Sequence, residues 1–249
     1  MKMGMIIPTR IGLELHKWVW KDARENSRPD TEILALLNGV TRRELLDGPG
    51  GDIPDGIDVH EMIGPFDDEC DLWKWCLDYA VGKGWDWCLV LHDDSMLKEP
   101  GWEEEIEEAA GWRVALASHQ TYTIWKKNGE TGNVVELESP KFGTNCDPCS
   151  FGFNVKIFQE RGCVSNWRIG FGFGCYETFA WCLGQKYAIR LLSGRLWHHP
   201  DWSKNTRDVL NVGANGHEDT KNKFASILPA YTEDDKYISI AGERVEIVP

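Results

Sequence analysis

The feature that most constrains the fold of this chain is the alternation of short apolar runs with helical segments. The runs at residues 3–9, 33–37 and 87–91 have the length of strands and contain no charged side chain. Residues 13–23 and 70–81 fit helices, and the second carries apolar residues at the spacing of one helical face. Strands that are apolar on both faces are typical of a parallel sheet covered by helices on each side. The sequence therefore predicts an α/β fold with a Rossmann-like, mostly parallel central sheet and helices on both faces.

Further elements continue the same order along the chain. We predict strands over residues 57–60, 113–118 and 186–193, a strand followed by a helix over 151–161, and a short helix over 176–183. Another helix opens at Pro100, where the acidic run from Glu103 to Glu105 fits a solvated first turn favoured by the helix dipole. Residues 45–58 are rich in Gly, Pro and Asp and are predicted to form a surface loop, and residues 120–144 a polar hairpin or excursion.

A single domain accounts for the length of the chain. At 249 residues the chain can bury one full-sized core, because single α/β domains often exceed about 200 residues. Residues 201–249 show little periodicity apart from residues 236–240. We therefore expect one domain over residues 1–200 and a C-terminal extension over 201–249 that wraps around it.

The charge balance and the apolar runs exclude some classes of protein. The 27 basic and 40 acidic side chains give a formal net charge of -13, so the overall field repels polyanions and disfavours unaided binding to a nucleic-acid backbone. A bound divalent cation can reverse that sign locally. No run approaches the roughly 20 apolar residues of a membrane-spanning helix, and the first residues lack a signal-peptide pattern. We expect a cytoplasmic protein.

The eight cysteines are interpreted as reduced thiols. Several lie in apolar periodic segments, where a thiol acts as a small hydrophobic side chain. Cys146 and Cys149 have the C-x-x-C spacing of a zinc or redox site, but no second ligand pair follows at the usual distance. We predict a loop with two free thiols there.

Two adjacent acids follow the apolar run at 87–91. Ligands of parallel sheets bind outside the carboxyl ends of the strands, which makes Asp93 and Asp94 candidates for a site. Two close carboxylates favour a bound cation, and oxygen ligands suit Mg²⁺ or Mn²⁺. The alternative is that both residues only cap the following turn.

Two further segments carry candidate chemical groups. Glycines at 170, 172 and 174 allow close approach of a ligand to the backbone, and Glu177 follows them at the predicted start of a helix. Glu177 is either a general base or an ordinary acid of a first helical turn. His198 and His199 follow the strand predicted over 186–193, where an imidazole either binds a metal or has a structural role.

In this order, the segments resemble the family 2 glycosyltransferases with the GT-A fold. Residues 6–10 are similar to the first-strand motif of that family. Residues 89–95 resemble its metal-binding acidic motif, and residues 172–187 resemble its Gly-rich segment, catalytic acid and later strand. The resemblance covers about residues 3–200 and implies a GT-A fold.

The resemblance also implies a function. It implies transfer of a sugar, with inversion, from a nucleotide-sugar donor, often UDP-linked, to an acceptor hydroxyl, with Mn²⁺ or Mg²⁺ on the diphosphate. Asp94 and one of His198 and His199 would hold the metal, and Glu177 would deprotonate the acceptor. The implied nucleotide-binding positions are Pro8, Thr9, Arg10, Asn38 and Asp93. In one departure from the family pattern, His92 stands where the first acid of a D-x-D motif is usual.

Two other functions remain open from the sequence. A nucleotidyltransferase on a similar sheet would use the same acids, although the segment after the first run is a poor phosphate-binding loop. A catalytically inactive glycan-binding protein with the same fold would agree with His92. The acceptor is a glycan, a protein, a small molecule or a modified nucleic-acid base, and fold analogy does not choose among these.

Overall fold

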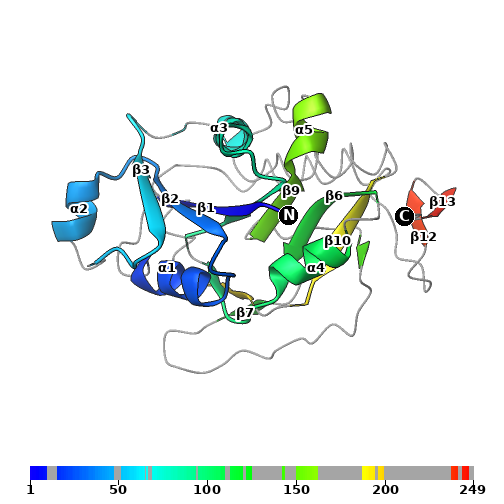
Figure 1. Ribbon diagram of the computed structural model, residues 1–249, viewed down its shortest axis with the longest axis horizontal. Helices are drawn as coiled ribbons and strands as arrows, with labels where there is room; N and C mark the ends of the chain where they lie inside the picture. Colours follow the sequence, from blue (N-terminus) through cyan, green and yellow to red (C-terminus); the bar gives the residue numbers. More distant parts are fainter. Residues whose placement is uncertain are drawn as a thin grey trace.

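The structure is a computed structural model (Figure 1). It describes residues 1–9, 16–47, 52–64, 66, 69–93, 95–109, 113–119, 122–124, 142–143, 150–161, 187–193, 196–198, 237–240 and 243–246.

A central sheet of eight strands organises the fold. Its strand order is β3-β2-β1-β4-β9-β6-β10-β8. The strands are β1 (Met3–Thr9), β2 (Glu32–Leu37), β3 (Ile57–Glu61), β4 (Trp87–Leu91), β6 (Val114–His119), β8 (Phe142–Gly143), β9 (Ser150–Asn154) and β10 (Ala188–Leu192). β9 runs antiparallel to both of its neighbours, and β8 runs antiparallel to β10; the other pairs are parallel. The predicted mostly parallel sheet is confirmed.

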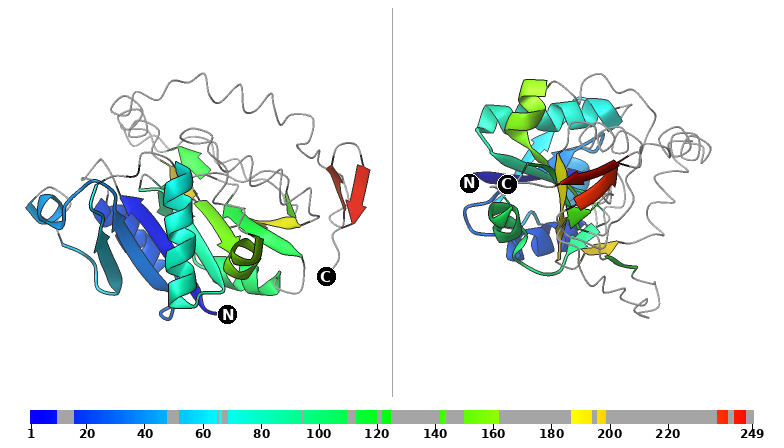
Figure 2. Two further views of the ribbon diagram at one scale, coloured as in Figure 1. Left: turned by 90° about the horizontal axis from the view of Figure 1, so that it is seen from above. Right: turned by 90° about the vertical axis from the view of Figure 1, so that its right-hand side faces the viewer.

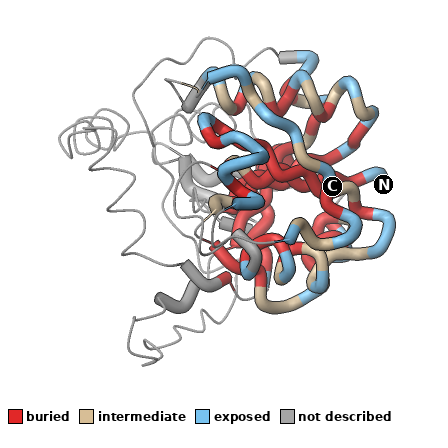
Figure 3. The backbone as a smooth tube through the Cα atoms, turned by 90° about the vertical axis from the view of Figure 1, so that its left-hand side faces the viewer, coloured by how far each residue is buried: buried red, intermediate tan, exposed pale blue. Residues whose placement is uncertain are grey.

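Helices cover both faces of this sheet, as predicted. The described helices are α1 (His16–Glu25), α2 (Arg42–Asp47), α3 (Glu69–Lys83), α4 (Trp102–Glu108) and α5 (Val155–Arg161), of which α2 lies beyond β3 at the side of the sheet. α3 and α5 lie side by side on one face, and α1 and α4 lie on the other (Figures 1 and 2). The central strands between these two layers are buried along their length (Figure 3).

β1 continues through Pro8 to Thr9 without losing a ladder hydrogen bond. The carbonyl of Thr9 accepts from the Asn38 backbone N–H at 2.7 Å, so the backbone groups of Thr9 face β2. Successive residues of a strand face opposite neighbours, which directs Pro8 toward β4. The register with β4 ends at Ile6, opposite Val90. Pro8 therefore lies past the last paired residues of β1 and β4, at the end of this ladder, where a missing N–H is tolerated.

Residues 42–47 form α2, whose last three residues fall in the predicted loop. The helix begins with a capping box: Glu44 N–H donates to Thr41 Oγ1 at 3.1 Å, and Thr41 N–H donates to Glu44 Oε2 at 2.8 Å. The Thr-x-x-Glu pattern is a sequence signal for the start of a helix, so α2 could have been predicted from the sequence.

A second, smaller sheet lies on the α1 side of the central sheet. It contains β5 (Ser95–Leu97), β11 (Leu196–His198) and β7 (Tyr122–Ile124), in the order β5-β11-β7. β7 and β8 belong to different sheets and do not pair with each other, and residues 125–141 between them lie outside the described part of the chain. β12 (Tyr237–Ile240) and β13 (Glu243–Glu246) pair with each other. In the part of the chain that the structure describes, no helix is both long and apolar enough to cross a membrane.

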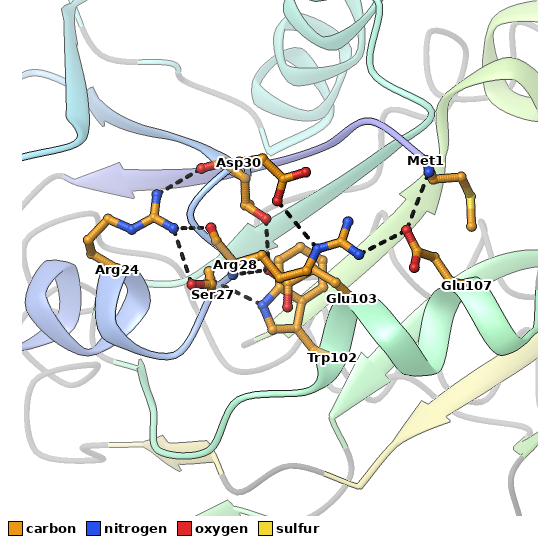
Figure 4. A network of polar contacts seen from close by, with 9 residues as sticks. Met1, Arg24, Ser27, Arg28, Asp30, Trp102, Glu103 and Glu107 are labelled. Atoms are coloured by element: carbon orange, nitrogen blue, oxygen red, sulfur yellow. Dashed lines mark hydrogen bonds and ion pairs between the residues drawn. The ribbon is translucent and has the colours of Figure 1, made fainter.

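The prediction that the acids at the start of α4 are solvated is wrong for Glu103. Its side chain is buried and accepts hydrogen bonds from Arg28 N–H at 2.9 Å and Thr31 Oγ1 at 2.8 Å (Figure 4). Burial raises the pKa of Glu103, while the two hydrogen bonds favour its charged form. Arg28 also pairs with Glu107 at 3.0 Å. These contacts join α4 to the turn that precedes β2.

Candidate functional site

Polar residues gather where the strands of the central sheet end. The carboxyl ends of β1, β2, β4 and β6 lie along one edge, and the antiparallel β9 begins at the same edge. The described polar residues there are Thr9, Asn38, His92, Asp93, His119 and Ser150. Ligands of such sheets bind outside this edge, so it is the candidate site.

Thr9 and Asn38 join the ends of β1 and β2. Both side chains are buried, and Thr9 Oγ1 donates to the Ile7 carbonyl at 3.2 Å. Asn38 Oδ1 accepts from the Phe66 backbone N–H at 2.7 Å. Because an N–H needs an acceptor, this bond fixes which end of the amide is oxygen. The remaining Nδ2 of Asn38 can only donate.

The acidic motif lies at the carboxyl end of β4. His92 and Asp93 are half-buried, and the His92 carbonyl accepts from the Ser95 backbone N–H at 3.1 Å. Ser95 then begins β5 in the smaller sheet. Asp94 lies outside the described residues. The structure thus places Asp93 at the predicted edge, and its role stays a prediction.

β11 brings one of the two predicted histidines beside this motif. In the antiparallel pairing of β11 with β5, the Cα partner of His198 is Ser95, the residue after Asp94. On its other side His198 is paired with Ile124 of β7. The backbone therefore brings the predicted metal ligand His198 beside Ser95, which follows the other predicted ligand, Asp94, in the sequence.

Several predicted residues lie outside the described part of the chain. They are Arg10, Asp94, Cys146, Cys149, Glu177 and His199, together with the glycines before Glu177. Among the residues that the structure does describe, no group of three or more His, Cys, Asp or Glu side chains is placed to hold a metal. Two described cysteines, Cys76 and Cys88, are free and buried, and burial raises the pKa of both thiols.

The sequence reasoning missed a buried pair between β6 and β9. His119 Nδ1 lies 2.5 Å from Ser150 Oγ, and neither side chain is exposed. Burial lowers the pKa of His119 to about 4, so the imidazole is neutral at physiological pH. Its Nε2 is buried without a hydrogen-bond partner among the described residues. Such an atom costs about 1–3 kcal/mol.

Only the strand register reveals this pair. Leu91, Ser150 and His119 occupy successive positions across β4, β9 and β6, one row inside the edge that carries His92. The sequence predicts a strand over 113–118, and the polar residue at its end gives no sign of a partner 31 residues away.

Comparisons with known proteins agree in the fold. No protein-family model matches the sequence, and no curated protein matches it. A crystal structure of GalNAc-T7 with UDP, GalNAc and Mn²⁺ is similar with a TM-score of 0.59 and 9% identity, over 80% of this chain and 44% of that chain. A crystal structure of S. aureus TarS 1-349 is similar to this chain with a TM-score of 0.56 and 11% identity, over 91% of this chain and 71% of that chain.

This chain has a GT-A fold. The chain spans less than half the length of the GalNAc-T7 chain that it resembles. At these identities the likeness concerns the backbone arrangement, and the predicted GT-A fold is confirmed at that level. Membership of family 2 is a finer statement than the fold supports.

Proposed function

We propose that the chain is a glycosyltransferase that transfers a sugar, with inversion, from a UDP-linked donor to an acceptor hydroxyl with the help of a divalent metal. The observation that carries this proposal is the polar carboxyl edge of a GT-A fold, where β11 brings His198 next to the residue that follows Asp94. The presence of UDP and Mn²⁺ in the GalNAc-T7 structure supports the donor and metal classes.

The proposed metal ligands are Asp94 and either His198 or His199, with Asp93 nearby. Carboxylate oxygen and imidazole nitrogen suit Mn²⁺, and Mg²⁺ accepts the oxygen ligands. The register of β5 with β11 supports this set because it brings the two chain segments together. When bound, the metal offsets the negative charge that develops on the leaving diphosphate.

The remaining roles belong to residues on either side of the metal. Pro8, Thr9, Arg10 and Asn38 would border the nucleotide, and the fixed amide of Asn38 offers it a hydrogen-bond donor. Glu177 would take the proton of the attacking acceptor hydroxyl.

Calorimetric titration with UDP tests the metal site. We expect tight binding in Mn²⁺, and loss of binding both in a chelator and in Asp94→Ala, because the diphosphate then meets uncompensated acids. Glu104→Ala removes an exposed acid of α4 and is the matched control that keeps wild-type affinity. Equal UDP affinity with and without the chelator would refute the metal assignment.

Donor hydrolysis separates an active transferase from a protein that only binds glycans. Because His92 occupies the first acidic position, the inactive alternative needs a direct test. Wild-type protein with Mn²⁺ is expected to release UDP from UDP-sugars, and Glu177→Gln to bind the donor normally while turning over about 10²–10⁴-fold more slowly. Wild-type turnover in Glu177→Gln would assign the base to another acid, and UDP binding without release in the wild type would favour the inactive protein.

A further inference from the structure

The His119–Ser150 pair lies on the side of the central sheet that carries the smaller sheet. A Cβ built on Gly152 would approach Ala117 and Leu89, so these three residues share one face. Side chains two residues apart along a strand share a face, which places His119, Ser150 and Leu91 there as well. The opposite face carries Phe151, whose ring contacts Trp73 of α3 at 4.2 Å between centroids. His119 is therefore on the same side as β5, β11 and β7 (Figure 1).

The chain segments that lead into β5 and β7 of the smaller sheet leave the same edge of the central sheet. β4 leads through His92 and Asp93 into β5, and β6 leads from His119 into β7 three residues later. β11, with His198 at its end, lies between β5 and β7. The strands that follow the acidic motif and His119 thus pair with β11 from its two sides, Ser95 opposite His198 and Tyr122 opposite Leu196.

The order of strands along this edge sets the direction in which a bound donor would extend. Thr9 ends β1, and β6 is three strand spacings of about 4.8 Å away across β4 and β9. The proposed nucleotide position is at β1 and β2, and the proposed metal position is at β4. An extended nucleoside diphosphate sugar that begins at β1 and crosses β4 carries its sugar toward β9 and β6.

We propose that His119 is a specificity-determining residue of this site, whose Nε2 hydrogen-bonds a hydroxyl of the donor's sugar while Ser150 holds the ring through Nδ1. This inference rests on the proposed function. An uncharged imidazole suits a hydroxyl better than a diphosphate, whose charge the metal and basic groups would meet. The contact with Ser150 occupies one ring nitrogen, so the ring orientation is set before a ligand arrives. Because the Ser150 hydroxyl can both donate and accept, Nε2 can meet a sugar hydroxyl as donor or as acceptor.

The ¹⁵N resonances of the His119 ring in the wild-type protein provide a test that does not depend on a variant folding. Titrations with Mn²⁺ use UDP alone, UDP-glucose and UDP-GalNAc. We expect a UDP-sugar to shift the Nε2 resonance and UDP alone to leave it unchanged. A Nε2 shift with UDP alone would overturn the sugar assignment in favour of the diphosphate. Donor binding without any Nε2 shift would overturn the inference, whereas failure of all three nucleotides to bind would refute the proposed function and this inference with it.

Two substitutions separate the two nitrogens of the ring. His119→Asn keeps a polar group at the position of Nδ1, beside Ser150, and removes the one at Nε2; His119→Gln does the reverse. We expect His119→Asn to melt within about 3 °C of the wild type. Its kcat/KM for hydrolysis of a UDP-sugar should fall at least about tenfold, with UDP affinity unchanged. His119→Gln, which keeps a polar group at the position of Nε2, should retain a higher kcat/KM than His119→Asn, even when it is the less stable of the two variants.

His60→Asn is the matched control, since His60 is an exposed histidine of β3 that packs on Trp75. It is expected to hydrolyse donors at the wild-type rate. Wild-type kcat/KM in a folded His119→Asn would show that the Ser150 contact alone accounts for His119 and would overturn the proposal.

Discussion

The two edges of the central sheet use polar residues in opposite ways. At the amino edge, Glu32 at the start of β2 accepts from Lys2 at 2.9 Å and from Lys83 at 3.2 Å. Asp86, just before β4, accepts from the Lys2 backbone N–H at 2.7 Å. At the carboxyl edge, His119 keeps a buried nitrogen without a partner among the described residues. The charges of Lys2, Lys83 and Glu32 are thus matched within the protein at the amino edge, where the buried group without a partner in the described part of the chain is the uncharged Trp85 Nε1. At the carboxyl edge that group is a titratable imidazole.

This difference separates stability from function within one sheet. Hydrogen bonding by Lys2, followed by Lys83, lowers the pKa of Glu32, which is the signature of an acid satisfied inside the fold. Burial alone lowers the pKa of His119, which is the signature of a group whose polar surroundings are incomplete. Substitutions at the amino edge should therefore change unfolding alone, whereas those at the carboxyl edge should also change ligand binding.

Gly4→Ala is expected to have the largest effect on stability. A Cβ at Gly4 would lie 2.2 Å from ring atoms of Trp85, which is buried beside the amino edge. Neither the strand nor a buried indole can move by that distance without opening the core. We expect a loss of at least about 3 kcal/mol in the free energy of unfolding, or failure to fold, measured by urea denaturation.

Gly82→Ala is the matched control for Gly4→Ala. Gly82 lies in α3, and nothing approaches within 4 Å of a Cβ built there. Alanine is favoured over glycine in a helix, so this variant should gain up to about 1 kcal/mol. A Gly4→Ala protein as stable as the wild type would show that the amino edge is not closely packed.

The pH dependence of stability should expose the unmatched imidazole at the carboxyl edge. Burial lowers the pKa of His119 to about 4 in the folded protein, from an ordinary value of 6.5. The unfolded chain therefore binds the proton first, and the stability that neutral His119 provides above about pH 6.5 is lost as the pH falls toward 4. Between pH 7 and pH 5 the expected loss is about 2 kcal/mol.

Comparison with His119→Phe isolates this contribution, because phenylalanine has a similar shape and does not titrate. Both proteins are unfolded by urea at pH 7, 6 and 5, and Glu103, whose raised pKa has the opposite effect, contributes equally to both. The wild type should lose more stability than the variant. Parallel pH profiles would show that the imidazole is protonated as easily in the fold as in the unfolded chain.

The elements predicted correctly are those whose signal lies within their own residues, and the features missed depend on residues far away in the sequence. β2 and β4 are apolar because both of their faces are buried, and α3 shows its periodicity directly, so all three were predicted. The antiparallel direction of β9 was not predicted, because the direction of a strand depends on how the chain returns to the sheet. Glu103 was misassigned because its burial is created by the distant residues Arg28 and Thr31.

The same distinction applies to the candidate site. Asp93 follows an apolar strand immediately, so its position at the carboxyl edge was readable. The neighbouring positions of His198 and Ser95 depend on a pairing between strands about a hundred residues apart, and the contact of His119 with Ser150 depends on the register of β9 with β6. Neither follows from periodicity or from a motif.

The smallest expected effect is at the amino-edge ion pairs. Glu32→Gln removes the charge that Lys2 and Lys83 share but keeps the side-chain size and one acceptor oxygen. The lysine side chains are 47% and 37% exposed, so solvent screens the interaction and the expected loss is only about 0.5–1 kcal/mol at low salt. In about 1 M NaCl the loss should shrink toward zero.

Glu160→Gln is the control, because its pair with Lys156 spans 4.0 Å on the surface of α5 and should contribute nothing measurable. The two variants and the wild type are compared by urea denaturation at both salt concentrations. A loss for Glu32→Gln that persisted in high salt would mean that hydrogen-bond geometry, and not charge, closes the amino edge, and the contrast between the two edges would then rest on packing at Gly4 and Trp85.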